Sequence, residues 1–326
     1  MPGTDPMEAC RVVFGELPGL PHLPELPARG PGADMVGRTA ALLVDLPVQT
    51  TPRGWQLADR PGRDMTRAAG YWSQDLDALE EVADGYRGPL KVQVCGPWTL
   101  AAALELSHSA ELALTDPGAV AELTDSLAEG LAAHAADVRK RVPGATLVVQ
   151  IDEPSLPAAL AGRVPTASGL SAVAAVDKAV SSQRLHIVLA APTAYTVVHC
   201  CGQPTPFPEI AAAGTAAISF DLDFLRVRDT DQVAELAEGG VGLFAGALPV
   251  TSAARLASGP PLAPRQTAER VVTLWQRTGL ATERLTEQAV VTPACGLAGV
   301  SPAAARAALR HCREAALIVP EMISPA

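Results

Sequence analysis

Short apolar runs of strand length alternate with longer segments of helical periodicity along most of the chain. Most runs lack clean alternation, as expected for parallel strands buried on both faces. The predicted strands are Leu20–Glu25, Leu90–Cys95, Thr146–Asp152, Thr196–Cys201, Ala216–Asp221, Val241–Ala245 and Ala289–Cys295. Predicted helices include Asp75–Tyr86, Pro117–Arg141, Gln232–Glu238, Ala268–Thr278 and Ala303–Ala316. This alternation predicts an α/β fold of the (β/α)8 TIM-barrel type, with an eighth strand expected at the extreme N-terminus.

The proline-rich segment Leu17–Gly32 contains the least secure of these strands. Its five prolines fix φ and remove backbone donors, so the segment must be largely extended. Its leucines favour an ordered segment that covers the substrate, and a disordered linker is the alternative interpretation. Residues 1–6 can supply only a stub of a further strand, so we expect the first strand of the barrel to be truncated in this sequence.

The residue types that precede several predicted helices are those that cap helix N-termini. Asp34 and Thr267 are the kinds of residue that accept hydrogen bonds from the first free backbone N–H groups of a helix. Asp116 and Ser301 each precede a proline, which is favoured at the first helical position. These residues therefore predict where the helices begin.

Composition and charge narrow the class of protein. The chain has 326 residues, of which 48% are hydrophobic, and we expect residues 1–326 to form a single domain. A formal net charge of −10 argues against nucleic acid or an acidic lipid surface as a partner. The longest apolar stretch, Ile187–Cys201, is interrupted and too short to span a membrane. Six cysteines without disulfide-framework spacing, and no secretory signal, predict a reduced, cytoplasmic protein.

Polar side chains occur at the ends of most predicted strands. They are Glu25, Asp152, Glu153, His199, Cys201, Asp221 and Cys295. The carboxyl ends of barrel strands form one face, the barrel mouth, which carries catalytic groups. Because alternate side chains of a strand share a face, His199 and Cys201 would point into the mouth and Cys200 away from it. With Cys295 and Asp221 nearby, a zinc site is predicted; the alternative is that the cysteines are ordinary buried residues.

The run Ile151-Asp152-Glu153-Pro154 ends a strand with two adjacent carboxylates. One interpretation is a pair that caps a helix or a loop. The other is that Asp152 receives a cationic amine in the barrel mouth. After the strand Leu90–Cys95, Gly96 permits close approach of the backbone, and Thr99 is placed to cap the next helix.

Taken in order, these motifs resemble the C-terminal catalytic barrel of cobalamin-independent methionine synthase, in the superfamily that also contains uroporphyrinogen decarboxylase. The matches are a start resembling Gly-Ser-x-Pro, then Asp34-Met35-Val36, Gly96-Pro97-x-Thr99, Ile151-Asp152-Glu153-Pro154, His199-x-Cys201, Ile218-Ser219-x-Asp221 and Cys295-Gly296-Leu297. They run along most of the chain. The ordered set is specific, although each single motif is short.

The resemblance implies a zinc site and assigns its ligands. His199, Cys201 and Cys295 would be zinc ligands, and Asp221 would fill the place of the family's glutamate ligand. Aspartate is one methylene shorter than glutamate. The bond from Asp221 to the metal is therefore expected to be long, mediated by water or absent.

The resemblance also implies how an amino-acid substrate would be held. Asp152 would bind the amino group of homocysteine, and Glu25 is the counterpart of a glutamate that shares this amine. The serine expected to bind the substrate carboxylate is absent from the stretch Met1–Pro6. Either this sequence begins inside the gene, or the acceptor is bound differently.

The activity implied by the resemblance is methyl transfer to a small thiol, homocysteine, to give methionine. The donor would be methyl-tetrahydrofolate, as in the long forms, or a methyl-corrinoid, as in short relatives; the few basic residues near the strand ends favour the corrinoid. One alternative is a non-catalytic or degenerate zinc-binding barrel. Another is a porphyrinogen decarboxylase-like enzyme, which would need arginines over the mouth, where this sequence places acids and thiols.

Overall fold

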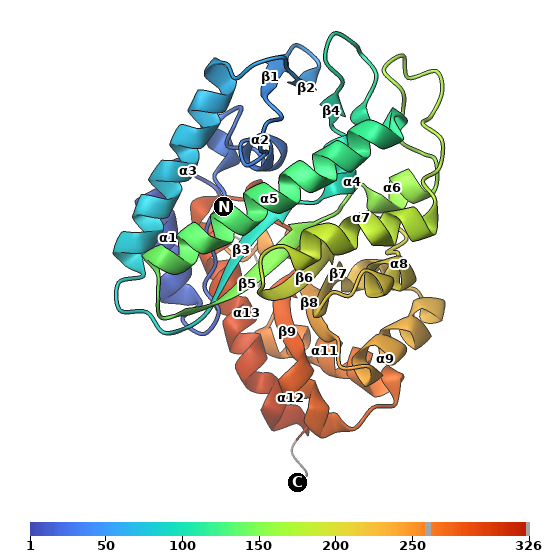
Figure 1. Ribbon diagram of the computed structural model, residues 1–326. Helices are drawn as coiled ribbons and strands as arrows, with labels where there is room; N and C mark the ends of the chain where they lie inside the picture. The colour runs from blue at the N-terminus through green and yellow to red at the C-terminus, as the bar shows by residue number, and fades with distance from the viewer. Residues whose placement is uncertain (258–261, 324–326) are drawn as a thin grey trace.

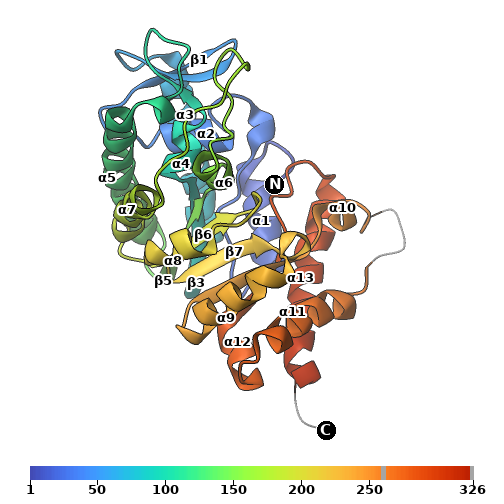
Figure 2. The same cartoon turned by 90° about the vertical axis from the view of Figure 1, so that its right-hand side faces the viewer.

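A computed structural model describes residues 1–257 and 262–323 and has a curled, six-stranded parallel sheet at its centre (Figures 1 and 2). The strands, in their order across the sheet, are β3 (Gly88–Cys95), β5 (Ala145–Asp152), β6 (Tyr195–Cys200), β7 (Ala217–Asp221), β8 (Gly242–Leu248) and β9 (Ala289–Pro293). Every neighbouring pair is parallel. The result is a mixed α/β half-barrel, consistent with a TIM-like barrel that is not fully closed.

Helices cover the outer surface of this sheet. The longer ones are α1 (Pro6–Glu16), α3 (Arg63–Val82), α5 (Pro117–Arg141), α7 (Lys178–Ala190), α9 (Thr230–Glu238), α11 (Pro264–Thr278) and α13 (Pro302–Ile323). Shorter helices are α2 (Met35–Ala40), α4 (Pro97–Ala101), α6 (Leu156–Leu160), α8 (Phe207–Ala212), α10 (Val250–Ala253) and α12 (Leu285–Gln288). The described part also has five 3-10 turns: η1 (Pro27–Arg29), η2 (Ala113–Thr115), η3 (Leu222–Phe224), η4 (Val227–Asp229) and η5 (Thr282–Arg284).

The predicted strand over Leu20–Glu25 is not a regular strand in the structure. This segment is nevertheless ordered and lies beside β3, where Leu23 N donates to Lys91 O and Lys91 N donates to Pro21 O, each at 2.9 Å. Pro21 and Pro24 have no N–H group, so the ladder cannot extend. The other six predicted strands are confirmed, with ends that differ by a few residues.

A second, smaller sheet was not predicted. It consists of the hairpin β1 (Val48–Thr51) and β2 (Gly54–Leu57), with β4 (Leu104–Glu105) parallel to β2. Figure 1 places it at one end of the molecule, beyond α2. Its strands have only two to four residues, which is too short for a reliable periodic signal in sequence.

Three of the five predicted helix caps are confirmed. The side chains of Asp34, Asp116 and Ser301 accept hydrogen bonds from backbone N–H groups at the starts of α2, α5 and α13. The prediction for Thr267 is wrong because α11 begins earlier, at Pro264. Thr267 is instead fully buried inside this helix, where its hydroxyl is 2.8 Å from His311 Nε2 of α13.

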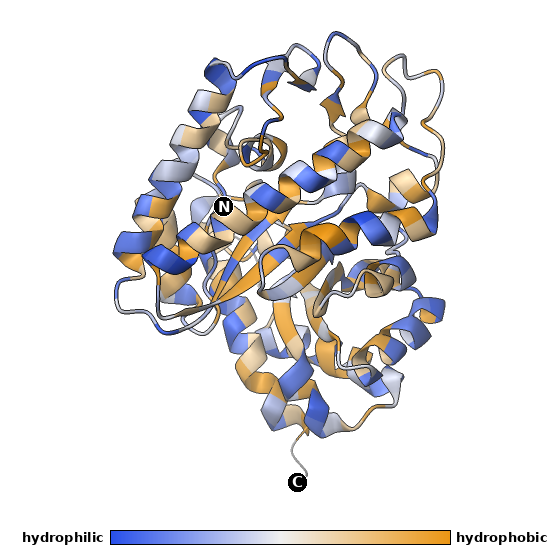
Figure 3. Cartoon of the chain, in the orientation of Figure 1, coloured by the Kyte–Doolittle hydropathy of each residue, from blue (hydrophilic) through white to orange (hydrophobic). Residues whose placement is uncertain are grey.

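Apolar side chains fill the space between the sheet and the helices. They also fill the inside of the half-barrel near the amino-terminal ends of its strands. The larger cluster lies between the sheet and the surrounding helices, whose outward faces are hydrophilic (Figure 3). A separate cluster joins Val148, Val197, Ala217 and Phe244 from four adjacent strands. No helix in the described part of the chain is long and apolar enough to cross a membrane.

The inward-facing side chains become polar toward the carboxyl ends of the strands. Alternation along β5 places Val148, Gln150 and Asp152 on one face, in that order. On β7 the same face carries Ala217 and then Ser219. An apolar floor therefore lies beneath a polar mouth, and this layering places the chemistry of the barrel at one end.

Charged side chains join the first and last helices, α1 and α13. Glu16 is 5% exposed, and its carboxylate accepts hydrogen bonds from Arg306 Nε at 2.7 Å and from Arg310 Nη2 at 2.9 Å. Hydrogen bonds first from Arg310 and then from Arg306 lower the pKa of Glu16 to about 2. The outer helical layer is thus continuous from α13 to α1.

We predict that Glu16→Gln lowers the free energy of unfolding by about 1–2 kcal/mol at neutral pH, because a charged, hydrogen-bonded carboxylate is lost. The lowered pKa means that this contribution is fully present above the ordinary value of 4.5 and is lost as the pH falls toward 2. Urea unfolding of both proteins should therefore show a difference that shrinks over this range. An equal difference at all pH values would contradict the prediction.

Candidate functional site

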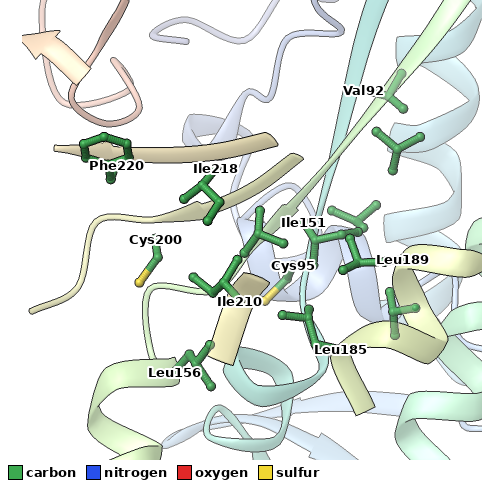
Figure 4. Close-up of a cluster of buried hydrophobic side chains, with 14 of the residues drawn as sticks. Val92, Cys95, Ile151, Leu156, Leu185, Leu189, Cys200, Ile210, Ile218 and Phe220 are labelled. Carbon is green, nitrogen blue, oxygen red and sulfur yellow. The ribbon is translucent and has the colours of Figure 1, made fainter. Parts of the chain in front are cut away.

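The end of β6 directs two potential metal ligands into the barrel mouth and one cysteine away from it. His199 lies in the strand, and Cys201 follows its last residue. Cys200 is completely buried on the other face, among Leu156, Ile210 and Phe220 (Figure 4). The predicted opposite orientation of adjacent side chains in this strand is confirmed.

His199, Cys201 and Cys295 meet in the mouth. One ligand atom from each residue lies within 4.8 Å of the others. The sulfurs of Cys201 and Cys295 are 3.7 Å apart and share a hydrogen bond. Cys295 follows β9 by two residues, so strands that are far apart in sequence supply the group.

Ser219 fixes the orientation of the His199 ring. His199 Nδ1 is 2.8 Å from Ser219 Oγ on the adjacent strand β7. With Nδ1 engaged in this way, Nε2 is the nitrogen that remains for a metal. An outer hydrogen-bond partner of this kind commonly orients a metal-binding imidazole.

The thiols of Cys201 and Cys295 have pKa values that are shifted in opposite directions. The pKa of Cys295 is lowered to about 4, first by the hydrogen bond with Cys201 and then by the hydrogen bond with His199. The same sulfur–sulfur hydrogen bond, together with burial, raises the pKa of Cys201. The pair therefore favours one thiolate, which is the form of cysteine that binds metals.

Asp221 lies at the end of β7 but outside the group formed by the other three residues. Its Oδ1 accepts a hydrogen bond from Asp223 N at 2.9 Å and so caps the turn η3. Burial raises its pKa, and the neighbouring charges of Asp223 and Cys295 act in the same direction. The carboxylate is thus near Cys295 but is used by its own turn.

Asp152 is buried at the end of β5, directly opposite His199 in the strand register. Gln150 Nε2 donates a hydrogen bond to Asp152 Oδ1 at 2.7 Å. Burial raises the pKa of Asp152, while His199 and Lys91 oppose this shift. A carboxylate so placed can accept hydrogen bonds from an ammonium group in the mouth.

Glu25 approaches the same region from the segment beside β3. Its carboxylate is 3.8 Å from Arg38 Nε and 23% exposed. Burial raises its pKa, Asp152 adds to the rise, and Arg38 and Lys91 oppose it. The two carboxylates predicted to hold an amine therefore interact electrostatically, and Lys91 acts on both.

Glu153 has a structural role that differs from that of Asp152. Its carboxylate accepts hydrogen bonds from Trp98 N, Thr99 N and Thr99 Oγ1 at 2.7–2.9 Å. It thus caps α4 from another strand, in place of the predicted cap by Thr99. Burial raises the pKa of Glu153 to about 7. Gly96 is required beside it, because a Cβ there would lie 2.3 Å from Glu153 Oε1.

The three clustered residues fit zinc by the chemistry of their donor atoms. One imidazole nitrogen and two cysteine sulfurs form a borderline-to-soft set, typical of zinc sites. Three protein ligands leave a position for a substrate, as in catalytic rather than structural sites. An imidazole already oriented by Ser219 agrees with this use.

Three residues that contact the predicted site residues were not predicted from the sequence. Gln150 and Ser219 received no role, although each lies two residues before a predicted site residue and alternation would have placed it on the same face. Arg38 had no sequence signal at all, because its partners Glu25 and Asp75 come from distant segments.

Comparisons with known proteins agree with this geometry. Residues 1–317 match the family described as cobalamin-independent synthase, catalytic domain. A search of curated protein sequences gives no match.

Two solved structures have a similar fold. A B12-independent methionine synthase from Shewanella sp. W3-18-1, in complex with selenomethionine, is 14% identical over 83% of this chain and 71% of that one, with a TM-score of 0.55. A methyltransferase from Methanosarcina mazei is 16% identical over 95% of this chain and 86% of that one, with a TM-score of 0.57. At these identities the likeness concerns the fold, and the family match over nearly the whole length decides the assignment: the chain belongs to the family of cobalamin-independent synthase catalytic domains.

Proposed function

We propose that this protein, as a single catalytic domain, is a zinc-dependent methyltransferase that methylates the thiol of homocysteine to give methionine. The observation that carries the proposal is the meeting of His199, Cys201 and Cys295 in the barrel mouth, beside the buried carboxylate of Asp152. Family membership supports a methyltransferase of the methionine synthase type.

In this proposal each side chain has a defined task. His199, Cys201 and Cys295 would hold zinc, and bound zinc would lower the pKa of a coordinated thiol so that it is anionic at neutral pH. Asp152 and Glu25 bind the substrate ammonium and thereby orient the sulfur. The apolar floor of the half-barrel keeps water from approaching from below.

The reaction requires little further from the protein. The substrate sulfur attacks the donor's methyl carbon, a sulfur–carbon bond forms, and the donor–methyl bond breaks with its electron pair leaving on the donor. Holding the two reactants at near-attack distance supplies much of the acceleration. A porphyrinogen decarboxylase is not favoured, because Arg29 and Arg38 are buried in ion pairs with Asp75 rather than directed over the mouth.

The first prediction from the proposed function concerns the reaction. Zinc-loaded protein and homocysteine should form methionine with methylcobalamin or with methyl-tetrahydrofolate, tested in parallel by quantifying methionine. We expect methylcobalamin to be the better donor, because few basic residues at the mouth could hold a folate polyglutamate tail. No methionine with either donor, despite full zinc occupancy, would favour the degenerate zinc-binding barrel.

The second prediction concerns the metal. His199→Ala and Cys295→Ser should each lower zinc content from about one ion per chain to a small fraction, because each removes one of three donors. Elemental analysis after dialysis measures the content.

Cys200→Ala is the matched control for this experiment. It removes a neighbouring cysteine that points into the apolar core, so zinc content should remain that of the wild type. Full zinc occupancy in both ligand variants would refute the assignment.

The third prediction concerns Asp221. Because its carboxylate caps η3 and lies outside the ligand group, Asp221→Ala should lose less zinc than Cys295→Ser. Asp221→Glu has a longer side chain and should retain or increase the zinc affinity, measured by competition with a chelator. Complete loss of zinc in Asp221→Ala would show instead that this carboxylate is an indispensable ligand.

A further inference from the structure

Arg38 is a buried cation close to the barrel mouth. It lies in α2 and is 1% exposed, and its guanidinium packs over the ring of Trp72, 3.9 Å from the ring centroid. One side of the guanidinium is paired with Asp75 of α3, which is also 1% exposed. Asp75 is paired in turn with Arg29 Nη2 at 2.7 Å.

The other side of the guanidinium faces Glu25. Arg38 Nε is 3.8 Å from Glu25 Oε1, and Arg38 Nε and Nη2 have no hydrogen-bond partner in the structure. Charges alternate from Arg29 through Asp75 and Arg38 to Glu25. Glu25, at 23%, is the most exposed of these four side chains, so the row ends at the accessible carboxylate.

We propose that Arg38 is a positioning residue for the amino-acid substrate: fixed by Asp75 and Trp72, it keeps Glu25 ionised and directed into the mouth, where Glu25 shares the substrate ammonium with Asp152. This inference rests on the function proposed above. It adds to that function a residue that does not touch the substrate.

The physical reason is the cost of a charged carboxylate that is largely removed from water. Among described groups, Arg38, Lys91, Asp152 and the Met1 ammonium act on Glu25, and Asp152 disfavours its charge. Burial is the largest influence that raises the pKa of Glu25, and Arg38 is the strongest influence that opposes this rise. A protonated Glu25 would lose its charge-assisted bond to an ammonium. Arginine suits the task because its rigid guanidinium can contact two carboxylates at once and stack on an indole.

The test compares two ligands that differ only in the amine. Homocysteine and 4-mercaptobutanoate both offer a thiol and a carboxylate, and their dissociation constants can be measured by calorimetry on zinc-loaded protein. We expect Arg38→Met to weaken homocysteine binding about tenfold and to leave 4-mercaptobutanoate binding nearly unchanged. In this variant Asp75 keeps its ion pair with Arg29, so its buried charge still has a partner.

The pH dependence gives a second readout. Without Arg38 the pKa of Glu25 would rise further, so Glu25 would become charged only at higher pH. The ratio of homocysteine dissociation constants, variant to wild type, should therefore fall as the pH is raised. Titration of the ligand cancels in this ratio. A ratio independent of pH would contradict the inference.

Two further variants make the result specific. Glu16→Gln disturbs a different buried ion-pair cluster, which joins α1 to α13 and includes neither Glu25 nor Asp152, and it should change neither dissociation constant. Arg38→Lys retains the charge and should weaken homocysteine binding less than Arg38→Met does. If Arg38→Met does not fold, Arg38→Lys decides by the same comparison of the two ligands.

The outcomes separate the inference from the proposed function. Equal weakening of both ligands, or no weakening, overturns the positioning role of Arg38 and leaves the proposed function intact. A wild-type protein that does not prefer homocysteine to 4-mercaptobutanoate overturns the amine site itself and, with it, the inference.

Discussion

The lateral register of β5, β6 and β7 is the constraint on which the candidate site depends. It places Asp152 opposite His199 and His199 opposite Ser219, so three polar side chains form one row across the mouth. A shift of one residue in any of these strands would turn its polar side chains outward into the apolar layer under the helices. The position of the candidate ligand His199, the orientation of its ring and the proximity of Asp152 therefore follow from one pairing pattern.

Three carboxylates that are buried or partly buried lie at or near the mouth, and each has different hydrogen-bond or ion-pair partners. Glu153 accepts three hydrogen bonds from the first residues of α4, so its carboxylate has a structural role. Asp152 receives one bond from Gln150 and keeps acceptor capacity. Glu25 forms an ion pair with the buried guanidinium of Arg38. The carboxylates with spare capacity are those suited to a cationic substrate group.

The outer layer stabilises a sheet that is not closed in the described residues. Helices α1 and α13 are adjacent, and Glu16 joins them through the arginines of α13. A separate apolar cluster, which includes Val13 of α1 and Leu309 of α13, lies beneath this contact. Helix α13 also packs against β9, and Leu297, two residues after Cys295, belongs to the same cluster. This packing therefore supports the segment that carries the candidate ligand Cys295.

The sequence by itself determined the alternating architecture, six strands of the sheet, the starts of α2, α5 and α13, and the residues that meet as a candidate metal group. These features depend on local periodicity, on capping chemistry and on the alternation of side chains along a strand, all of which can be read from neighbouring residues. Only the tertiary structure decided that Pro21 and Pro24 limit the segment beside β3 to a single bridge, that Asp221 caps its own turn, and that Glu153 caps α4. It alone brought Arg38 to Glu25, because that contact joins segments whose spacing in the sequence carries no periodic signal and is set by the packing of α2 against α3 and β3.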